Sequence, residues 1–476
     1  MSLSRRSLLT AAAAAPVLAP VGAAHAAAPQ TAVPQTVVPQ TVVPQAGPAL
    51  WPAAVTLPAG HRFDLKAEAA DLFGREILLD QSRVHQQVAF DPVTGLAYAV
   101  QCISNGRLLA DETDPLPDGT KPLPLPDEER ARRGDLCVNQ VGPDGTVLAV
   151  MYLRGFGHGA GLGVEHVDGI PWLWLETDAV RVPDDNDSTT TENAHGRHIG
   201  RLAFTPGAIV DAGSPLVQVF DPVPGATAVT PSLDIDHGRI AVRHVSSGIA
   251  GYRVYDLDAF KSGAFTAKHS FPAKFATQSW CLYGDLVYQN EGKANAESWW
   301  TVYDVRTGKD VERIRNTTAP DLVHRETEAL TVRRTPTGPQ LVFGFATTRE
   351  NKRHMALYGI SGTTVPWTPL DLDPAIKLSS TSYVPEYRQS GDRVDLRLRV
   401  ERVDGKPWAS NTTILTLPAH LRPTRIQGMV GTATGAGTIT GPLAVRCEVN
   451  TEGHLRLYDE RGFTGWIALD AGYFTS

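Results

Sequence analysis

The chain has 476 residues, of which 42% are hydrophobic and 20% are charged, so it is long enough to bury a large core. Its formal charge is −7 at pH 7, and this acidic balance argues against nucleic acid or anionic lipid as a partner. Four cysteines stand far apart without a C-x-x-C pair, which excludes a zinc ribbon and a thioredoxin motif. An oxidising compartment would permit one disulfide, between Cys102 and Cys137.

Residues 1–26 have the pattern of a removable export signal. Arg5-Arg6 precede an alanine-rich apolar run, and paired arginines in this place indicate the twin-arginine translocon as the partner during export. Loss of these two arginines with the signal would change the charge from −7 to −9. The alternative, a transmembrane anchor, is disfavoured because the run is short and contains Pro16 and Pro20, and no later stretch approaches the ~20 apolar residues of a span. We therefore expect a secreted or cell-wall-associated protein.

Residues 27–50 repeat a Pro-Gln-Thr motif with a proline at every fifth position. Such a segment is typical of an extended spacer, and we predict a linker here.

From residue 51 onward the sequence consists of short strand-like runs separated by turn residues, as at Asp91–Gly95 and Asp304–Gly308. The same unit of strands can be recognised five times, at a spacing of roughly 50 to 75 residues. The first strands of these units are expected near residues 84–87, 161–164, 227–230, 277–280 and 326–329, and the third strands near residues 135–139, 199–204, 252–256, 300–304 and 355–358. This pattern predicts an all-β fold, a five-bladed β-propeller over residues 51–420. The alternative is a pair of β-sandwiches.

The pattern loosens after residue 365. We interpret residues 365–420 as the closure of the propeller or an extra layer on a blade. Residues 421–476 contain a glycine-rich segment and a final hairpin, and they are predicted to form a small C-terminal β-module.

Several motifs resemble the TagC-like and phage receptor-binding propellers. They are His85-Gln86-Gln87 with Phe90-Asp91, the segments 134–140 and 151–159, Trp172–Glu176 and Arg325–Leu330, so the resemblance covers approximately residues 60–360. It implies a five-bladed propeller that recognises an extracellular polysaccharide or a wall glycopolymer, teichoic-acid-like or acidic. No catalytic residue is carried over from this family.

One enzymatic hypothesis is a polysaccharide lyase. His85 and His158 would come from neighbouring blades and serve as base and acid, because histidine exchanges protons near neutral pH. Tyr252 or Tyr98 would be an auxiliary acid, and Arg243 would neutralise the carboxylate of the substrate. The alternative is that these side chains satisfy backbone groups inside the blades.

Amide side chains near the same strands are candidate ligands of sugar hydroxyls, because an amide both donates and accepts hydrogen bonds. The predicted substrate-binding residues are Gln86, Gln87, Asn139, Gln140 and Gln278, together with Arg325 for an anionic group. Arg201 is a further candidate for that neutralising role.

A second enzymatic hypothesis is glycoside hydrolysis, which needs two carboxylates about 5 to 9 Å apart. Glu165, Glu176, Glu326 and Glu328 lie on or near predicted strands, and the last two share one strand face. The alternative is that these carboxylates anchor Arg325 or a neighbouring blade.

No cofactor is expected, although Asp178 and Asp184–Asp187 leave a structural calcium loop open beside the favoured solvated loop. Six tryptophans serve either as platforms for sugars or as packing between blades: Trp172, Trp174, Trp280, Trp299, Trp300 and Trp466. Nucleotide chemistry is excluded because no P-loop or dinucleotide fingerprint is present. Two classes of function remain, a glycan-binding propeller and a carbohydrate-active enzyme.

Overall fold

The computed structural model describes residues 56–58, 60–74, 76–104, 107–112, 129–183, 192–434 and 442–476. The predicted export signal, the Pro-Gln-Thr linker and the Asp184–Asp187 run lie outside these ranges. Within them, no helix is long and apolar enough to cross a membrane.

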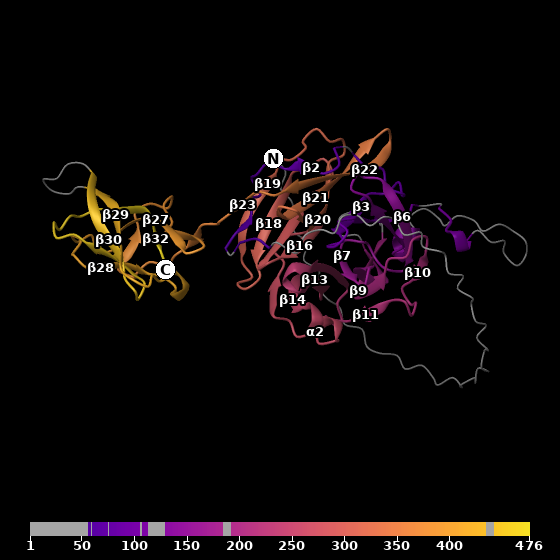
Figure 1. Ribbon diagram of the computed structural model, residues 1–476, viewed down its shortest axis with the longest axis horizontal. Coiled ribbons are helices and arrows are strands. Elements are labelled where there is room, and N and C mark those ends of the chain that lie inside the picture. The colour runs from indigo at the N-terminus through magenta and orange to yellow at the C-terminus, as the bar shows by residue number, and fades with distance from the viewer. Residues whose placement is uncertain are drawn as a thin grey trace, which may run out of the picture. The chain divides into compact units, whose positions relative to one another are not determined.

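Five sheets form the propeller (Figure 1), each with four antiparallel strands and one of them with an additional parallel strand. The strand named first in each blade below is its inner strand, and inner strands of different blades contact one another. Blade 1 contains β3 (His85–Phe90), β4 (Ala97–Cys102), β5 (Leu136–Val141) and β6 (Val147–Arg154), with β10 (Ile209–Asp211) added beside β6. Blade 2 contains β7 (Leu162–Val167), β8 (Ile170–Pro183), β9 (Glu192–Ala203) and β11 (Gln218–Phe220). Blade 3 contains β12 (Ala228–Asp234), β13 (Arg239–Ser246), β14 (Ile249–Asp256) and β15 (His269–Pro272).

Blade 4 contains β16 (Ser279–Tyr283), β17 (Leu286–Glu291), β18 (Ser298–Asp304) and β19 (Asp310–Asn316). Blade 5 contains β20 (Glu326–Thr335), β21 (Gly338–Arg349), β22 (Lys352–Ile360) and β2 (Ala70–Asp71). The short helices are η1 (Ala110–Glu112), α1 (Glu129–Arg133), η2 (Ile235–His237), α2 (Leu257–Lys261) and η3 (Ala419–Leu421). The prediction of an all-β, five-bladed propeller is confirmed, and the inner strands lie where the sequence pattern placed them.

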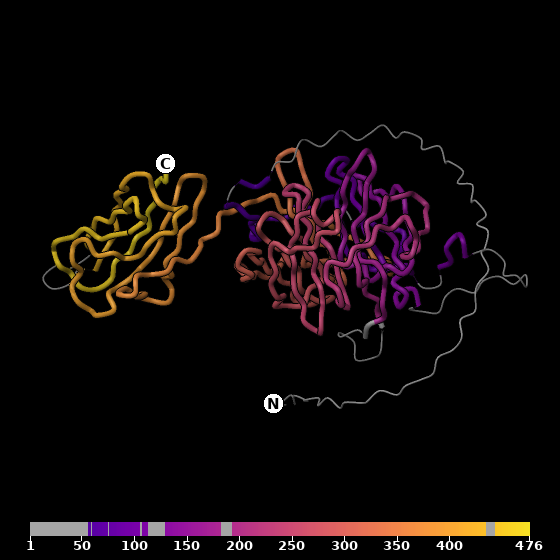
Figure 2. Tube along the Cα trace, turned by 90° about the horizontal axis from the view of Figure 1, so that it is seen from below, coloured from indigo at the N-terminus to yellow at the C-terminus, as the bar shows by residue number. Residues whose placement is uncertain are grey.

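The ring is closed by pairing between its two ends. The early strand β2 completes blade 5 by pairing with β22, and β1 (Arg62–Phe63) pairs with β23 (Thr363–Thr364). Figure 2 shows this early segment, in indigo, beside the orange strands that end the propeller. Phe63 is fully buried and packs between Tyr283 and Tyr288 of blade 4, so the early segment also contributes to the core.

Side chains join the inner strands to one another across the axis. The Gln87 amide oxygen accepts a hydrogen bond from the Leu330 N–H of blade 5 at 2.9 Å, and its nitrogen donates to the Trp280 carbonyl of blade 4 at 3.4 Å. Ser232 of blade 3 accepts from the Leu282 N–H of blade 4 at 2.9 Å. These short polar side chains satisfy strand edges that would otherwise be buried without partners.

The strands from residue 368 onward form one curled nine-stranded sheet. Its strands are β24 (Thr368–Pro369), β25 (Ile376–Leu378), β26 (Glu386–Ser390), β27 (Arg393–Arg402), β28 (Thr412–Thr416), β29 (Gln427–Thr434), β30 (Pro442–Val449), β31 (His454–Tyr458) and β32 (Ile467–Phe474). The alternation Val394, Leu396, Leu398, Val400 turns one face of β27 into a shared core. The expected boundary between residues 420 and 421 falls between β28 and β29, inside this sheet.

The four cysteines, all within the described ranges, are free and buried. Cys102 lies opposite Leu136 in the β4–β5 pair, so Cys102 and Cys137 are offset by one residue. Because side chains alternate between the faces of a strand, the two thiols point to opposite faces. A Cys102–Cys137 disulfide is therefore not formed.

We predict that Gln87→Ala lowers the free energy of unfolding by about 1–3 kcal/mol, because it leaves the buried Leu330 N–H without its acceptor. Gln86→Ala is the matched control: this half-buried residue sits in a β-bulge of the same strand, and its loss should cost about 0.5 kcal/mol or less. Urea denaturation followed by fluorescence measures both, and equal effects would contradict the role assigned to Gln87.

Candidate functional site

One face of the propeller gathers most of the predicted site residues. Because successive strands of a blade are antiparallel, the start of each inner strand lies beside the end of the second strand and the start of the third. We call this the start face and define it by the residues where the inner strands begin, namely His85, Leu162, Ala228, Ser279 and Glu326. The opposite side is the end face.

A buried carboxylate holds the turn that carries His158. Glu176 is fully buried, and its Oε1 accepts hydrogen bonds from the N–H groups of His158 (3.1 Å), Gly159 (2.7 Å) and Ala160 (3.3 Å). Its Oε2 accepts from the Gly196 N–H at 2.6 Å, which fixes the neighbouring part of β9. One side chain therefore positions both His158 and the segment that contains His195.

The glycine before His158 is required by this arrangement. Gly157 has φ +151°, and a Cβ at this position would overlap with the Glu176 carboxylate. The glycines around His158 thus permit close approach of the backbone to Glu176.

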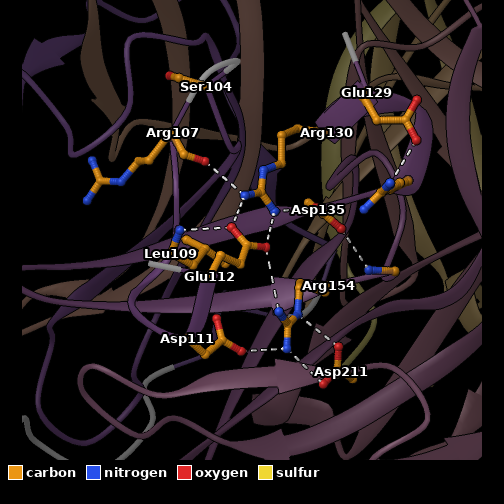
Figure 3. A network of polar contacts seen from close by, with 12 residues as sticks. Ser104, Arg107, Leu109, Asp111, Glu112, Glu129, Arg130, Asp135, Arg154 and Asp211 are labelled. Carbon is orange, nitrogen blue, oxygen red and sulfur yellow. Dashed lines mark hydrogen bonds and ion pairs between the residues drawn. The ribbon is translucent and has the colours of Figure 1, made fainter. Parts of the chain in front are cut away.

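Arg130, Asp135, Glu112 and Arg154 belong to a network of polar contacts (Figure 3) that is joined to the same turn. Arg130 of α1 is completely buried, and its guanidinium pairs with Asp135 at 2.9 Å and with Glu112. Asp135 in turn accepts from the Gly155 N–H at 3.2 Å, and the Gly134 carbonyl accepts from the N–H groups of residues 156 and 157. The network therefore fixes the backbone that leads to His158.

His158, His195 and Arg243 come together at the start face. The ring centroids of the two histidines are 5.4 Å apart. Burial, with smaller contributions from His158 and Arg243, lowers the pKa of His195 to about 3, so this imidazole is neutral at physiological pH. Burial also lowers the pKa of the adjacent His244. The cluster combines neutral imidazole groups with one permanent positive charge.

Two of the predicted catalytic residues lie inside the blades instead. His85 is 1% exposed, burial lowers its pKa to about 3, and its ring lies against Gly344 of blade 5. Tyr252 is fully buried between blades 3 and 4 and donates to Gln289 at 2.6 Å. Burial raises the pKa of Tyr252, an effect that the nearby Arg243 only partly offsets. The expected His85–His158 pair is replaced by the contact between His158 and His195.

Most of the predicted amides bind protein groups. Gln87 bridges inner strands, Asn139 is fully buried and accepts from the Asp80 N–H at 2.9 Å, and Gln140 donates to Tyr98 at 2.8 Å. Gln86 and Gln278 are half-buried at the start face.

The guanidinium of Arg325 binds protein groups. Its guanidinium donates to the carbonyls of Thr318 (2.9 Å) and Asn316 (3.0 Å) and to the Ser298 hydroxyl (3.0 Å), and it covers the Phe345 ring. Burial lowers its pKa. These contacts tie blade 4 to blade 5.

The four candidate carboxylates have separate environments. Glu165 pairs with Arg201 at 3.1 Å and Lys261 at 2.8 Å, and Glu326 contacts His324 at 3.0 Å. Glu328 is 4% exposed and lies in a β-bulge of β20. Burial, reinforced by Glu326, raises the pKa of Glu328 well above its ordinary value. Bulges often redirect side chains next to functional sites.

Several buried polar atoms at the start face have no hydrogen-bond partner among the described residues. They come from different blades: both ring nitrogens of His85, Arg243 Nε, His244 Nδ1, Asn290 Oδ1 and Thr327 Oγ1. Such groups are uncommon in folded proteins and call for an explanation. Among them, His85 (1% exposed), Thr327 (1%) and Asn290 (0%) are enclosed between the blades.

The predicted tryptophans divide by location. Trp174, Trp280 and Trp300 are buried in the blades, whereas Trp172 is covered by Arg201 at 4.0 Å. Trp299 and Phe275 enclose Arg313, at 4.5 and 4.6 Å, and Arg313 pairs with Glu291 at 2.9 Å.

His195, His244 and Arg313 were not among the residues predicted for the site. His195 lies at the start face because it pairs with Val180 in β8–β9, a register that no local sequence pattern signals.

The end face contains a small cavity. A cavity of about 50 Å³ opens there, enough for a few water molecules only, and is lined by inner-strand residues that include Asp234 and Arg333. Arg334 of blade 5 pairs with Asp236 of blade 3 at 2.6 Å beside it. Within the described ranges, no three histidine, cysteine or acidic side chains are grouped to hold a metal ion.

No protein-family model and no curated protein match this chain. Among solved structures, the tail fiber of Staphylococcus aureus phage P68 aligns with 85% of this chain and 96% of its own, at 13% identity and a TM-score of 0.45. The alpha-L-arabinofuranosidase from Lactobacillus brevis aligns with 60% of this chain and 92% of its own, at 9% identity and a TM-score of 0.33. Trypanosoma rangeli sialidase aligns with 88% and 97%, at 7% identity and a TM-score of 0.29. These similarities concern the fold.

The buried Glu176 carboxyl predicts a pH dependence of stability. Burial raises its pKa to about 7, from an ordinary value of 4.5. The folded state therefore holds a proton that the unfolded state has lost, and this contribution to stability disappears as the pH rises from about 4.5 through 7. Between pH 4.5 and 8, the free energy of unfolding of the wild type should fall by about 3 kcal/mol relative to that of Glu176→Gln.

Chemical denaturation at closely spaced pH values measures this difference. The exposed carboxylate Glu297 supplies the matched control, and Glu297→Gln should show no such trend. A constant difference between the wild type and Glu176→Gln across this range would contradict the raised pKa.

Proposed function

We propose that this chain is a glycan-binding propeller that recognises an anionic extracellular polymer, either a teichoic-acid-like glycopolymer or an acidic polysaccharide, at its start face. The observation that carries the proposal is the cluster of His158, His195 and Arg243, in which the buried Glu176 fixes the backbone at His158 and at Gly196, next to His195.

The chemistry of this cluster suits a polar anionic ligand. A guanidinium is always charged and pairs well with carboxylate or phosphate, and a neutral imidazole both donates and accepts hydrogen bonds. The backbone around His158 is fixed by hydrogen bonds to Glu176, so little freedom is lost when a ligand binds.

Binding is favoured over elimination by the state of the proposed acid and base. His85 is buried with a pKa of about 3, and burial raises the pKa of Tyr252. Neither group exchanges a proton readily near neutral pH, which is what general acid–base catalysis requires. The predicted twin-arginine signal agrees with a polymer outside the cytoplasm as the ligand.

The test is a binding screen of the mature chain against wall teichoic acids and uronate polysaccharides by calorimetry. We expect Arg243→Gln to weaken binding at least tenfold, because it removes the positive charge that faces the ligand. Arg306→Gln is the control, since Arg306 is exposed in the β18–β19 turn at the end face, and it should bind like the wild type. Lack of binding to every anionic polymer, or equal binding by Arg243→Gln, would exclude the proposal.

A second candidate function, glycoside hydrolysis, is supported by Glu328. A general acid of a glycosidase needs a raised pKa, and burial raises that of Glu328 next to Glu326. If the protein releases reducing ends from a polysaccharide, Glu328→Gln should lower kcat at least about 100-fold. Glu165→Gln, at an ion-paired carboxylate, should change kcat only severalfold. A wild type that binds polymers without releasing reducing ends would eliminate this candidate.

A further inference from the structure

The C-terminal sheet carries a groove of its own. The groove has a volume of about 610 Å³, within the range of small-molecule sites, and lies over strands β27, β29 and β32. The segment 379–385, between β25 and β26, forms one wall. Residues that line it include Tyr383, Val384, Arg397, Val430, Thr432 and Asp470.

Hydrogen bonds anchor both ends of the segment 379–385, although the ring of Tyr383 within it is open to solvent. Ser379 donates from its N–H (3.2 Å) and its hydroxyl (3.3 Å) to the Arg399 carbonyl, and the Pro385 carbonyl accepts from the Leu370 N–H at 2.8 Å. Between these anchors Tyr383 is 48% exposed. The ring is therefore presented by a fixed loop.

Arg399 lies beside the groove, paired in β27–β32 with Ala468 of its floor. Its guanidinium is 5.0 Å from the Tyr383 ring centroid and 4.0 Å from that of Trp466. Its Nε is buried, and in the described part of the chain neither a hydrogen-bond acceptor nor a carboxylate pairs with this side chain. By contrast, Arg397 pairs with Glu386 at 2.6 Å, and Arg388 pairs with Asp395 at 3.0 Å.

We infer that this groove binds a neutral pyranose unit of an oligosaccharide. The apolar face of a sugar ring packs against Tyr383, which Arg399 supports from beside the groove, and its hydroxyl groups donate to Asp470 and accept from Thr432. Arg397 offsets the charge of Glu386, and the remaining carboxylate of the lining, Asp470, disfavours an anionic ligand. The site thus differs in chemistry from the start face, and it rests on observations of its own.

The inference is tested with the full mature chain by affinity electrophoresis in gels that contain dextran, arabinogalactan or glucomannan. We expect at least one of these neutral polysaccharides to retard the wild type. Tyr383→Ala and Asp470→Asn should raise the Kd at least tenfold. Arg388→Gln is the matched control, because this arginine of the same module is ion-paired and does not line the groove. It should be retarded like the wild type, and thermal unfolding confirms that each variant is folded.

The start-face variant Arg243→Gln should keep its retardation in these gels, so failure at one site is distinguishable from failure at the other. Retardation by no neutral polysaccharide would overturn the inference. Equal retardation of Tyr383→Ala, Asp470→Asn and the wild type would also overturn it. The inference would also fail if the sedimentation coefficient of the wild type rose with protein concentration and that of Tyr383→Ala did not. This result would mean that a second copy of the chain occupies the groove.

Discussion

The propeller depends on how the edges of its inner strands are satisfied. Each inner strand is an edge strand, and its free N–H and C=O groups are buried near the axis, where an unpaired backbone group costs about 1–3 kcal/mol. Side chains such as Gln87 and Ser232 reach across to these groups from neighbouring blades. These contacts draw the inner strands of the blades together near the axis.

At the start face, rigidity is achieved with buried charge. Arg130 and Asp135 form a buried ion pair, and Glu176 is buried against four N–H donors. Such groups are expensive to desolvate, so they contribute less to stability than to a single, well-defined backbone geometry. Their shared target is the turn of residues 155–160. The buried ion pair and Glu176 therefore fix the same stretch of backbone, which carries His158.

The sequence predicted the fold better than the site. Turn residues and strand alternation are local signals, so they placed the five inner strands correctly and also marked the strand around Val394–Val400. They did not show that this strand shares one sheet with residues 427–474, because that depends on the long-range pairing of β27 with β32. The histidines illustrate the limit. His85 and His158 look alike in the sequence, but a bulge after His85 and the glycine Gly344 opposite it send one ring into the core. His195 reaches the site through strand register, which no local pattern encodes.

The two candidate sites also differ in how they achieve selectivity. At the start face, half-buried Arg243 lies near the neutral imidazole of His195, and this positive charge favours an anion. The lining of the C-terminal groove contains Asp470 and the ion pair of Arg397 with Glu386, while Arg399 beside it is covered by the rings of Tyr383 and Trp466. A polymer that alternates charged groups with neutral sugars offers a ligand to each site.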